Sequence, residues 1–236
     1  MGTLYNVLGV LIGGSLGLLV GDRLSKEVQE SLLKVTGVAV FILGIAGAVQ
    51  GLLRVTGSSL SSQNSMMMIA SLVIGTIIGE FFKIEQRFDH FGLWLKKVTG
   101  SDKDARFVDA FVTTSLTICV GAMAVVGSLQ DGLTGDSSTL VAKTVLDLMI
   151  VLILTASKGK GALFSAVPIF LIQGSITVLA RFLAPILTDT ALANLSLVGS
   201  VLILCVGINL TWGKQIRVAN MLPAIVVAIL CAFLNI

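Results

Sequence analysis

The sequence predicts an all-α, polytopic membrane protein from its composition, its apolar segments and the distribution of its basic residues. Hydrophobic residues make up 55% of the 236 residues, charged residues only 12%, and the mean hydropathy is +1.00. Soluble domains carry about 25% charged residues, so a soluble chain of this composition could not cover its own surface. We therefore expect residues 1–236 to form one transmembrane helix bundle, because no polar insert is long enough to fold alone.

Eight apolar segments approach the ~20 residues that a helix needs to cross a bilayer. The polar run GSSLSSQNS after the second segment is expected to be a flexible connection. The predicted spans are residues 3–21, 35–53, 66–82, 108–129, 140–156, 163–183, 195–212 and 221–236.

Basic residues alternate between the connections of these eight spans. The connections after the first, third, fifth and seventh spans hold three, six, two and two basic residues, which is 13 of the 16 in the chain. The opposite connections hold only Arg54, and Lys143 and Arg181 lie inside or at the edge of spans. Because cytoplasmic connections are rich in Lys and Arg, both termini are expected outside the cytoplasm.

Residues 84–98, in the longest cytoplasmic connection, have the pattern of an amphipathic helix. Apolar residues recur at steps of four and three, with basic residues elsewhere around the helix. We expect this helix to lie in the membrane interface, held by anionic lipid, with Trp94 near the headgroups. The apolar positions are Ile84, Phe88, Phe91, Leu95 and Val98.

Lys143 and Asp147 lie within the predicted span 140–156, where charged side chains are costly. They stand one helical turn apart and can form a local ion pair, although Lys143 can also extend to the outer surface. At 1.5 Å per residue, Asp147 lies about 10 Å into the span. We expect Asp147 to face a polar interior, where it binds an ion, takes up a proton or connects helices.

The spans on either side of this one carry polar and helix-breaking residues. Interrupted backbone at this depth requires neighbouring protein or water, so interruptions in both spans would mark a binding site. Hydroxyls bonded to their own helix and a simple kink are the alternatives. The candidates are Ser115, Thr117 and Gly121 in span 108–129, and Gln173 and Gly174, preceded by Pro168, in span 163–183.

Six further polar residues near the ends of spans are secondary candidates. An acid at such a position is usually solvated or paired with a nearby basic residue, and Asp-Gly is typical of turns. They are Glu80, Asp109, Asn209 and Asn220 toward the cytoplasm, and Gln130 and Asp131 at the outer mouth.

No residue pattern indicates catalysis, a cofactor or a metal. The chain has no Ser/His/Asp set, no HExxH motif and no nucleotide-binding loop, so we expect it not to be an enzyme. Cys119, Cys205 and Cys231 lie in apolar segments and are expected to be buried free thiols. The basic residues are scattered over short loops, which argues against nucleic-acid binding.

Short similarities between spans suggest internal repeats. FILGIAG at 41–47, TICVGAM at 117–123 and LILCVGI at 202–208 each place a glycine after an apolar run. Asn6 opens NVLGVLIGG and Asn220 opens NMLPAIVVA, in spans predicted to cross in opposite directions, as in inverted repeats. Convergent apolar composition is the alternative. Short, glycine-rich spans also suit close packing, within the chain or in a homodimer.

The run CVGAMAVVGSLQDGLTGD at 119–136, with LVAKTVLD at 140–147, resembles the bacterial membrane-protein family catalogued as domain of unknown function 554. The opening GTLYNVLGVLIGGSLG and the closing IRVANMLPAIVVA resemble it as well. The resemblance covers the whole chain and implies a bacterial inner-membrane protein. Members of this family are usually labelled transporters, so the resemblance also implies transport. It assigns no substrate and no functional residue.

The sequence favours a small secondary transporter or channel for a small polar solute or ion. Its pathway would be lined by spans 108–129, 140–156 and 163–183, with Asp147 as the charged element. The alternative is a non-transporting scaffold that binds another membrane protein through its small-residue faces.

Overall fold

The computed structural model of the chain consists almost entirely of helices, arranged as two compact units. It describes all residues except 22, 57–58, 102–103, 120–121, 185–187 and 234–236. The first unit comprises Met1–Thr36, Gln86–Cys119 and Met123–Leu183. The second consists chiefly of Gly37–Glu85 and the residues after Leu183.

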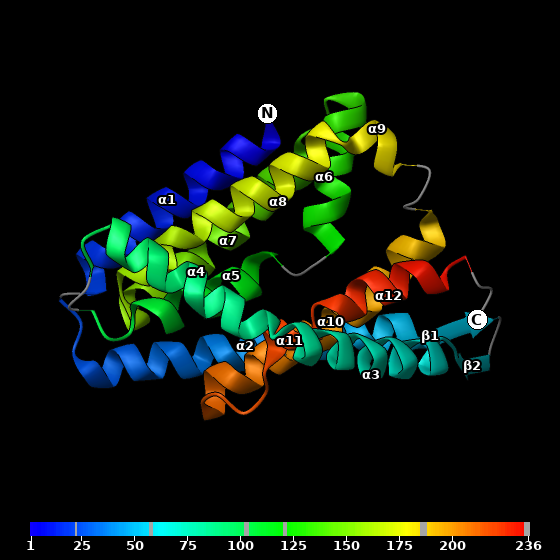
Figure 1. The fold of residues 1–236 in the computed structure, drawn as a ribbon, viewed down its shortest axis with the longest axis horizontal. Coiled ribbons are helices and arrows are strands. Elements are labelled where there is room, and N and C mark those ends of the chain that lie inside the picture. The colour runs from blue at the N-terminus through cyan, green and yellow to red at the C-terminus, as the bar shows by residue number, and fades with distance from the viewer. Residues whose placement is uncertain (22, 57–58, 102–103, 120–121, 185–187, 234–236) are drawn as a thin grey trace. The chain divides into compact units, whose positions relative to one another are not determined.

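The first unit is a bundle in which α1, α7 and α8 run side by side (Figure 1). It also contains the helix predicted at 84–98, which the structure confirms as α4. Its helices are α1 (Gly2–Gly21), α4 (Ile84–Val98), α5 (Phe107–Cys119), α6 (Ala122–Thr134), α7 (Ser138–Lys158), the 3-10 helix η1 (Lys160–Ser165), α8 (Ala166–Val178) and α9 (Ala180–Leu183).

Glycines bring α1 and α7 into backbone contact. Gly9 faces Thr144 and Gly17 faces Leu152, both 135 positions further along the chain, so the two helices are parallel. A Cβ atom added to Gly17 would lie 2.5 Å from the carbonyl oxygen of Leu152, which only a glycine avoids. Small residues spaced this way allow close helix approach where lipid provides no hydrophobic drive for association.

The other long helices of this unit run antiparallel to their neighbours. Thr3 near the start of α1 meets Thr177 near the end of α8, with 3.3 Å between the Oγ1 atoms. Lys158 at the end of α7 bonds to Asp109 at the start of α5. Helices α1 and α7 thus run in one direction, and α5 and α8 run in the other. The predicted order of spans requires the same directions within this unit.

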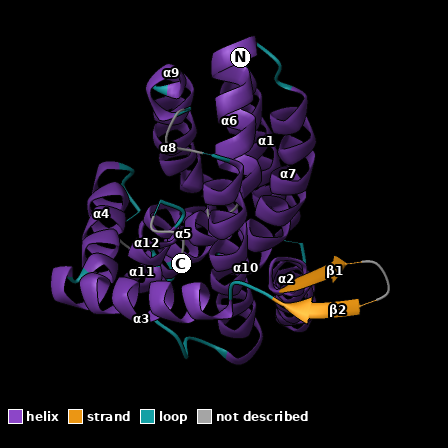
Figure 2. Cartoon of the chain, turned by 90° about the vertical axis from the view of Figure 1, so that its right-hand side faces the viewer, coloured by secondary structure: helices purple, strands orange, loops and turns teal. Residues whose placement is uncertain are grey.

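The described residues of the second unit include most of α2, four further helices and a small hairpin, the two orange strands in Figure 2. Gly37 of α2 faces Thr211 of α10, and Gly51 faces Leu197, so these two helices are antiparallel and in close contact. The elements are α2 (Lys26–Leu52), β1 (Leu53–Thr56), β2 (Ser59–Ser62), α3 (Ser65–Phe82), α10 (Asp189–Trp212), α11 (Val218–Met221) and α12 (Pro223–Cys231).

The described residues contain six helices that are long and apolar enough to cross a membrane. A seventh span results if α5 and α6, whose axes differ in direction by 62°, are counted together. The predicted span 221–236 corresponds to the shorter apolar helix Val218–Cys231, so the eight predicted spans are not confirmed. The six helices are α1, α2, α3, α7, Lys160–Val178 and α10.

Two connections differ from the sequence prediction. Helix α2 begins at Lys26, not near residue 35, because Ser25 Oγ accepts the Val28 N–H at 3.4 Å and caps the helix. Part of the run expected to be flexible, Ser59–Ser62, pairs antiparallel with Leu53–Thr56, with Leu53 opposite Ser62. The β-branched residues Val55 and Thr56 suit a strand, which the polarity of the run did not indicate.

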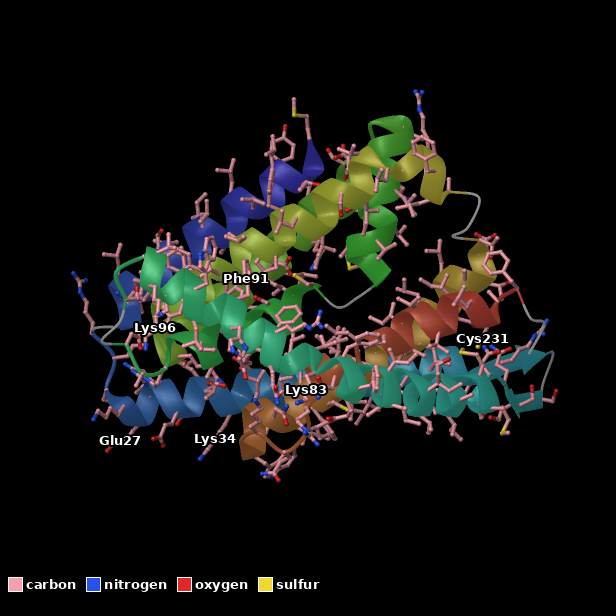
Figure 3. All side chains as sticks on the ribbon, in the orientation of Figure 1. Glu27, Lys34, Lys83, Phe91, Lys96 and Cys231 are labelled. Carbon is pink, nitrogen blue, oxygen red and sulfur yellow. The ribbon has the colours of Figure 1, made fainter. Side chains whose placement is uncertain are left out.

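Helix α4 packs part of its apolar side against the protein. The ring of Phe91 lies 5.8 Å from that of Phe111 on α5, and Leu95 is buried. Trp94 stacks on Phe91 and is exposed on its outer side. Figure 3 labels Phe91 and Lys96 on this helix, and Lys83 just before it. The interfacial position of α4 therefore remains a prediction, with Trp94 on its exposed side.

Candidate functional site

A layer of buried polar groups crosses the first unit, with contributions from α1, α5, α7 and α8. Its side chains are Asn6, Lys143, Asp147 and Gln173, each no more than 8% exposed. The main-chain carbonyl of Ile118 completes it. We call these five groups the polar layer.

The centre of the polar layer is the ion pair between Lys143 and Asp147. Lys143 Nζ donates to Asp147 Oδ1 at 2.8 Å, one turn along the same helix. The exposed fractions of the two side chains are only 10% and 3%. Burying two charges costs several kcal/mol per ion, by order of magnitude, unless further hydrogen bonds satisfy the remaining polar atoms. The neighbouring helices provide those bonds.

Helix α5 contributes a main-chain carbonyl to the same ammonium. Lys143 Nζ donates to the Ile118 carbonyl oxygen at 2.9 Å. Helix α5 thus provides an oxygen ligand for the ammonium from outside α7.

Asn6 connects Asp147 to Gln173. Its Nδ2 donates to Asp147 Oδ2 at 3.0 Å and to Gln173 Oε1 at 3.3 Å. Asn6 is 0% and Gln173 1% exposed. Asn6 Oδ1 and Gln173 Nε2 are buried without a hydrogen-bond partner among the residues that the structure describes. One free acceptor and one free donor therefore lie beside the ion pair.

An apolar layer lies one helical turn from the polar layer on three of its helices, α1, α7 and α8. Val10 and Val151 follow Asn6 and Asp147 by four residues, and Ile169 precedes Gln173 by four. Val10, Val151 and Ile169 are fully buried and pack in one cluster. Four residues of helix rise about 6 Å, so the polar groups lie directly next to a tightly packed apolar plug.

The other primary candidates from the sequence lie near this layer in the chain but do not join its hydrogen bonds. Ser115 is buried and its Oγ has no partner within the described part of the chain, whereas Thr117 bonds back to the Thr113 carbonyl at 2.8 Å. Gly121 lies outside the described residues. Gly174 is helical, and a Cβ atom there would meet nothing within 4 Å.

The interruption expected at Gln173–Gly174 is absent, because α8 continues through both residues. Pro168 lies in the first turn of α8, where its missing N–H has no intrahelical partner to lose. Span 108–129 is described as two helices, α5 and α6, whose axes differ in direction by 62°, and residues 120–121 between them lie outside the described residues.

The secondary candidates form ion pairs and hydrogen bonds outside the polar layer. In the first unit Asp109 pairs with Lys158 at 2.7 Å, and Gln130 accepts a bond from Thr139. Asp131 accepts bonds from the Met1 ammonium at 2.8 and 3.0 Å. In the second unit, the bonds are Glu80 to Arg217, Asn220 to the N–H of Glu85, and Asn209 to the backbone of Gln215 and Ile216. None of these six belongs to the polar layer.

Two members of the polar layer were not among the sequence candidates. Asn6 had a usable signal, because it is a carboxamide inside an otherwise apolar span. The Ile118 carbonyl had none, since every residue has a main-chain carbonyl and nothing in the sequence distinguishes this one.

The fold and the polar layer define a helical membrane protein with a charged network in its interior. The chain belongs to the family described as "Protein of unknown function (DUF554)", whose profile matches residues 1–233. The resemblance inferred from the sequence is therefore confirmed.

Two curated proteins are similar over nearly their whole length. The chain is 28% identical to "Uncharacterized protein YqgA" of Escherichia coli (strain K12), over 97% of this chain and 94% of that protein. It is 25% identical to "Uncharacterized membrane protein YdfK" of Bacillus subtilis (strain 168), over 96% and 93% respectively. No solved structure matches the chain.

Proposed function

We propose that this protein is a small secondary transporter or channel that moves a small polar solute or ion across the membrane. The observation that carries the proposal is the pair of unpartnered atoms, Asn6 Oδ1 and Gln173 Nε2, beside a buried ion pair. Buried polar atoms are normally satisfied by protein or water, so free ones at this depth suit a bound solute, ion or water molecule. Ionisable residues inside membrane spans commonly mark such pathways.

The change of 62° in direction between α5 and α6 supports the same proposal. In secondary transporters, binding sites form at discontinuous helices near the middle of the membrane. Ile118 on α5 provides its main-chain carbonyl to Lys143. The pathway that we propose is lined by α5, α7 and α8, as the sequence favours, with Asn6 of α1 added. We further propose an inner-membrane location with both termini outside the cytoplasm.

A non-transporting scaffold is the alternative function. It would use the small-residue helix faces to bind another membrane protein. Those faces are occupied within the units themselves, because Gly13 and Gly17 of α1 contact α7, and Gly44 and Gly51 of α2 contact α10. This occupation favours the transport proposal.

Flux measurements in proteoliposomes test the proposal. Asp147→Asn should abolish flux of the transported solute while the protein still elutes as a folded species in detergent. Asp136→Asn is the matched control, because Asp136 is an exposed carboxylate just before α7 and should leave flux unchanged. Unchanged flux in Asp147→Asn would remove Asp147 from the pathway. Absence of flux for every solute, with a stable co-purifying membrane protein, would favour the scaffold.

A further inference from the structure

The ammonium of Lys143 occupies a position that is built for a cation. Its Nζ contacts two oxygens from different helices, Asp147 Oδ1 at 2.8 Å and the Ile118 carbonyl at 2.9 Å. A third oxygen, Asn6 Oδ1, is buried on the carboxamide that bonds to the same carboxylate, and no described residue bonds to it. One carboxylate, one main-chain carbonyl and one amide oxygen are hard ligands of the kind that alkali and alkaline-earth ions prefer.

We propose that the polar layer binds a monovalent alkali cation, and that this cation displaces the Lys143 ammonium from Asp147 and Ile118. The inference rests on the function proposed above. It names the class of ion that would be transported or would be coupled to transport. An ammonium and a potassium ion carry the same charge and are similar in size. The exchange therefore leaves the net charge of the buried layer unchanged and avoids the cost of an added buried charge.

The ligand set favours a monovalent cation over a divalent one. Calcium and magnesium sites normally use several carboxylates or retain several waters. Within the described part of the chain no three His, Cys, Asp or Glu side chains are grouped as a metal site would require. The layer has one carboxylate, Asp147, whose charge one monovalent ion balances.

An anion fits the layer less well. Gln173 Nε2 is a free donor, but Asn6 Nδ2, the amide that reaches Gln173, also bonds to the carboxylate of Asp147. An anion beside this carboxylate would be repelled in a medium of low dielectric constant. We therefore assign Gln173 Nε2 to a water or to the hydroxyl of a co-transported solute.

Lys143 is placed so that its side chain can leave. It lies five residues after Ser138, the first residue of α7, which corresponds to about 7.5 Å of helix. Side chains of a helix tilt toward its N-terminus, so an alternative rotamer directs the four-carbon chain toward that end. Lysine side chains near span ends commonly extend to the interface in this way.

Chemical labelling of the unmodified protein tests the displacement. The purified chain in nanodiscs is treated with acetic anhydride in sodium, potassium or N-methylglucamine chloride at equal ionic strength. Acetylation of Lys143 and of exposed Lys97 is followed by peptide mass spectrometry. We expect the Lys143 rate, normalised to Lys97, to rise severalfold in sodium or potassium. Equal rates in all three salts overturn the inference, and this result does not depend on a variant that folds.

A pair of variants provides the second test. Lys143→Met removes the tethered competitor, whose effective concentration is of order millimolar or higher. Its melting temperature should rise with sodium or potassium, with a half-saturating concentration at least about tenfold below that of the wild type, a difference of about 1.4 kcal/mol. Lys143→Met/Asp147→Asn should show no response to either salt. A response that persists in the double variant overturns the site.

The two proposals fail in different ways. Solute flux that is independent of sodium and potassium, together with salt-independent labelling of Lys143, would support the transport proposal and overturn the cation site. Salt-dependent labelling without flux of any solute would support the cation site and overturn transport.

Discussion

Asn6 and Gln173 share one hydrogen bond, 3.3 Å from Asn6 Nδ2 to Gln173 Oε1, and each retains one unpartnered buried atom. Two carboxamides can satisfy each other through two parallel bonds, since each has a donor and an acceptor. Here the bond from Asn6 Nδ2 to Asp147 Oδ2 fixes the orientation of the Asn6 amide. Because Asp147 holds the Asn6 amide in this orientation, the second bond between the two carboxamides does not form. Asn6 Oδ1 and Gln173 Nε2 therefore remain free.

Asn6→Leu should lower the free energy of unfolding by about 1.5–3 kcal/mol, because the charged carboxylate of Asp147 loses the hydrogen bond that Asn6 Nδ2 donates to it. The measurement is unfolding of the detergent-solubilised protein by SDS. Thr3→Val is the control one turn away on α1, where only a neutral hydroxyl contact at 3.3 Å is lost. Its effect should stay below about 1 kcal/mol. Equal effects of the two changes would contradict the role of Asn6.

Lys143→Met should destabilise the protein by about 3–5 kcal/mol in N-methylglucamine buffer, because it leaves the Asp147 carboxylate buried without its counter-ion. Lys143→Met/Asp147→Asn should recover most of this loss, since replacing both charges of a buried pair is often close to neutral. The coupling energy from SDS unfolding of the single and double variants is the readout. A double variant as unstable as Lys143→Met would show that the ion pair is not the source of the effect.

Gly13→Ala and Gly174→Ala should have opposite effects, although both glycines are helical. A Cβ atom at Gly13 would overlap the carbonyl of Leu148, and a helix backbone cannot yield locally, so α1 must move away from α7. We expect a loss of at least about 2 kcal/mol, within the range for overpacked sites. At Gly174 the space is open, and alanine should be neutral or stabilise by about 0.5–1 kcal/mol. Thermal melting in detergent compares them, and similar losses would contradict the close contact.

Reporter fusions in bacteria should place both termini outside the cytoplasm, because 13 of the 16 basic residues lie in alternate connections. Alkaline phosphatase fused after residue 236 should therefore be active, whereas a fusion after Lys97, in the connection with six basic residues, should be inactive. Activity at Lys97 without activity at the C-terminus would reverse the predicted orientation.

The sequence predicted the features that depend on composition or on spacing along one helix. The helical class, the helix at 84–98 and the Lys143–Asp147 pair follow from hydropathy, periodicity and a separation of four residues. Each is a local property, so the sequence contains the required information.

Features that depend on contacts between helices were not predicted. The role of Asn6 depends on residues more than 140 positions away, and the Ile118 carbonyl is bonded by Lys143 on another helix, 25 positions along the chain. The error at Gln173–Gly174 has a related cause. A glycine inside an apolar helix is tolerated when its hydrogen bonds remain intact, and sequence alone does not show whether they do.

The plug formed by Val10, Val151 and Ile169 limits how a solute could pass. A continuous water-filled pore at this level would require these three fully buried aliphatic side chains to lie apart. A static open pore between them is therefore incompatible with this packing. Passage between these side chains would instead require α1, α7 and α8 to rearrange once per cycle. Such a device would operate as a carrier at the rate of its own conformational change, far more slowly than ions diffuse through an open channel.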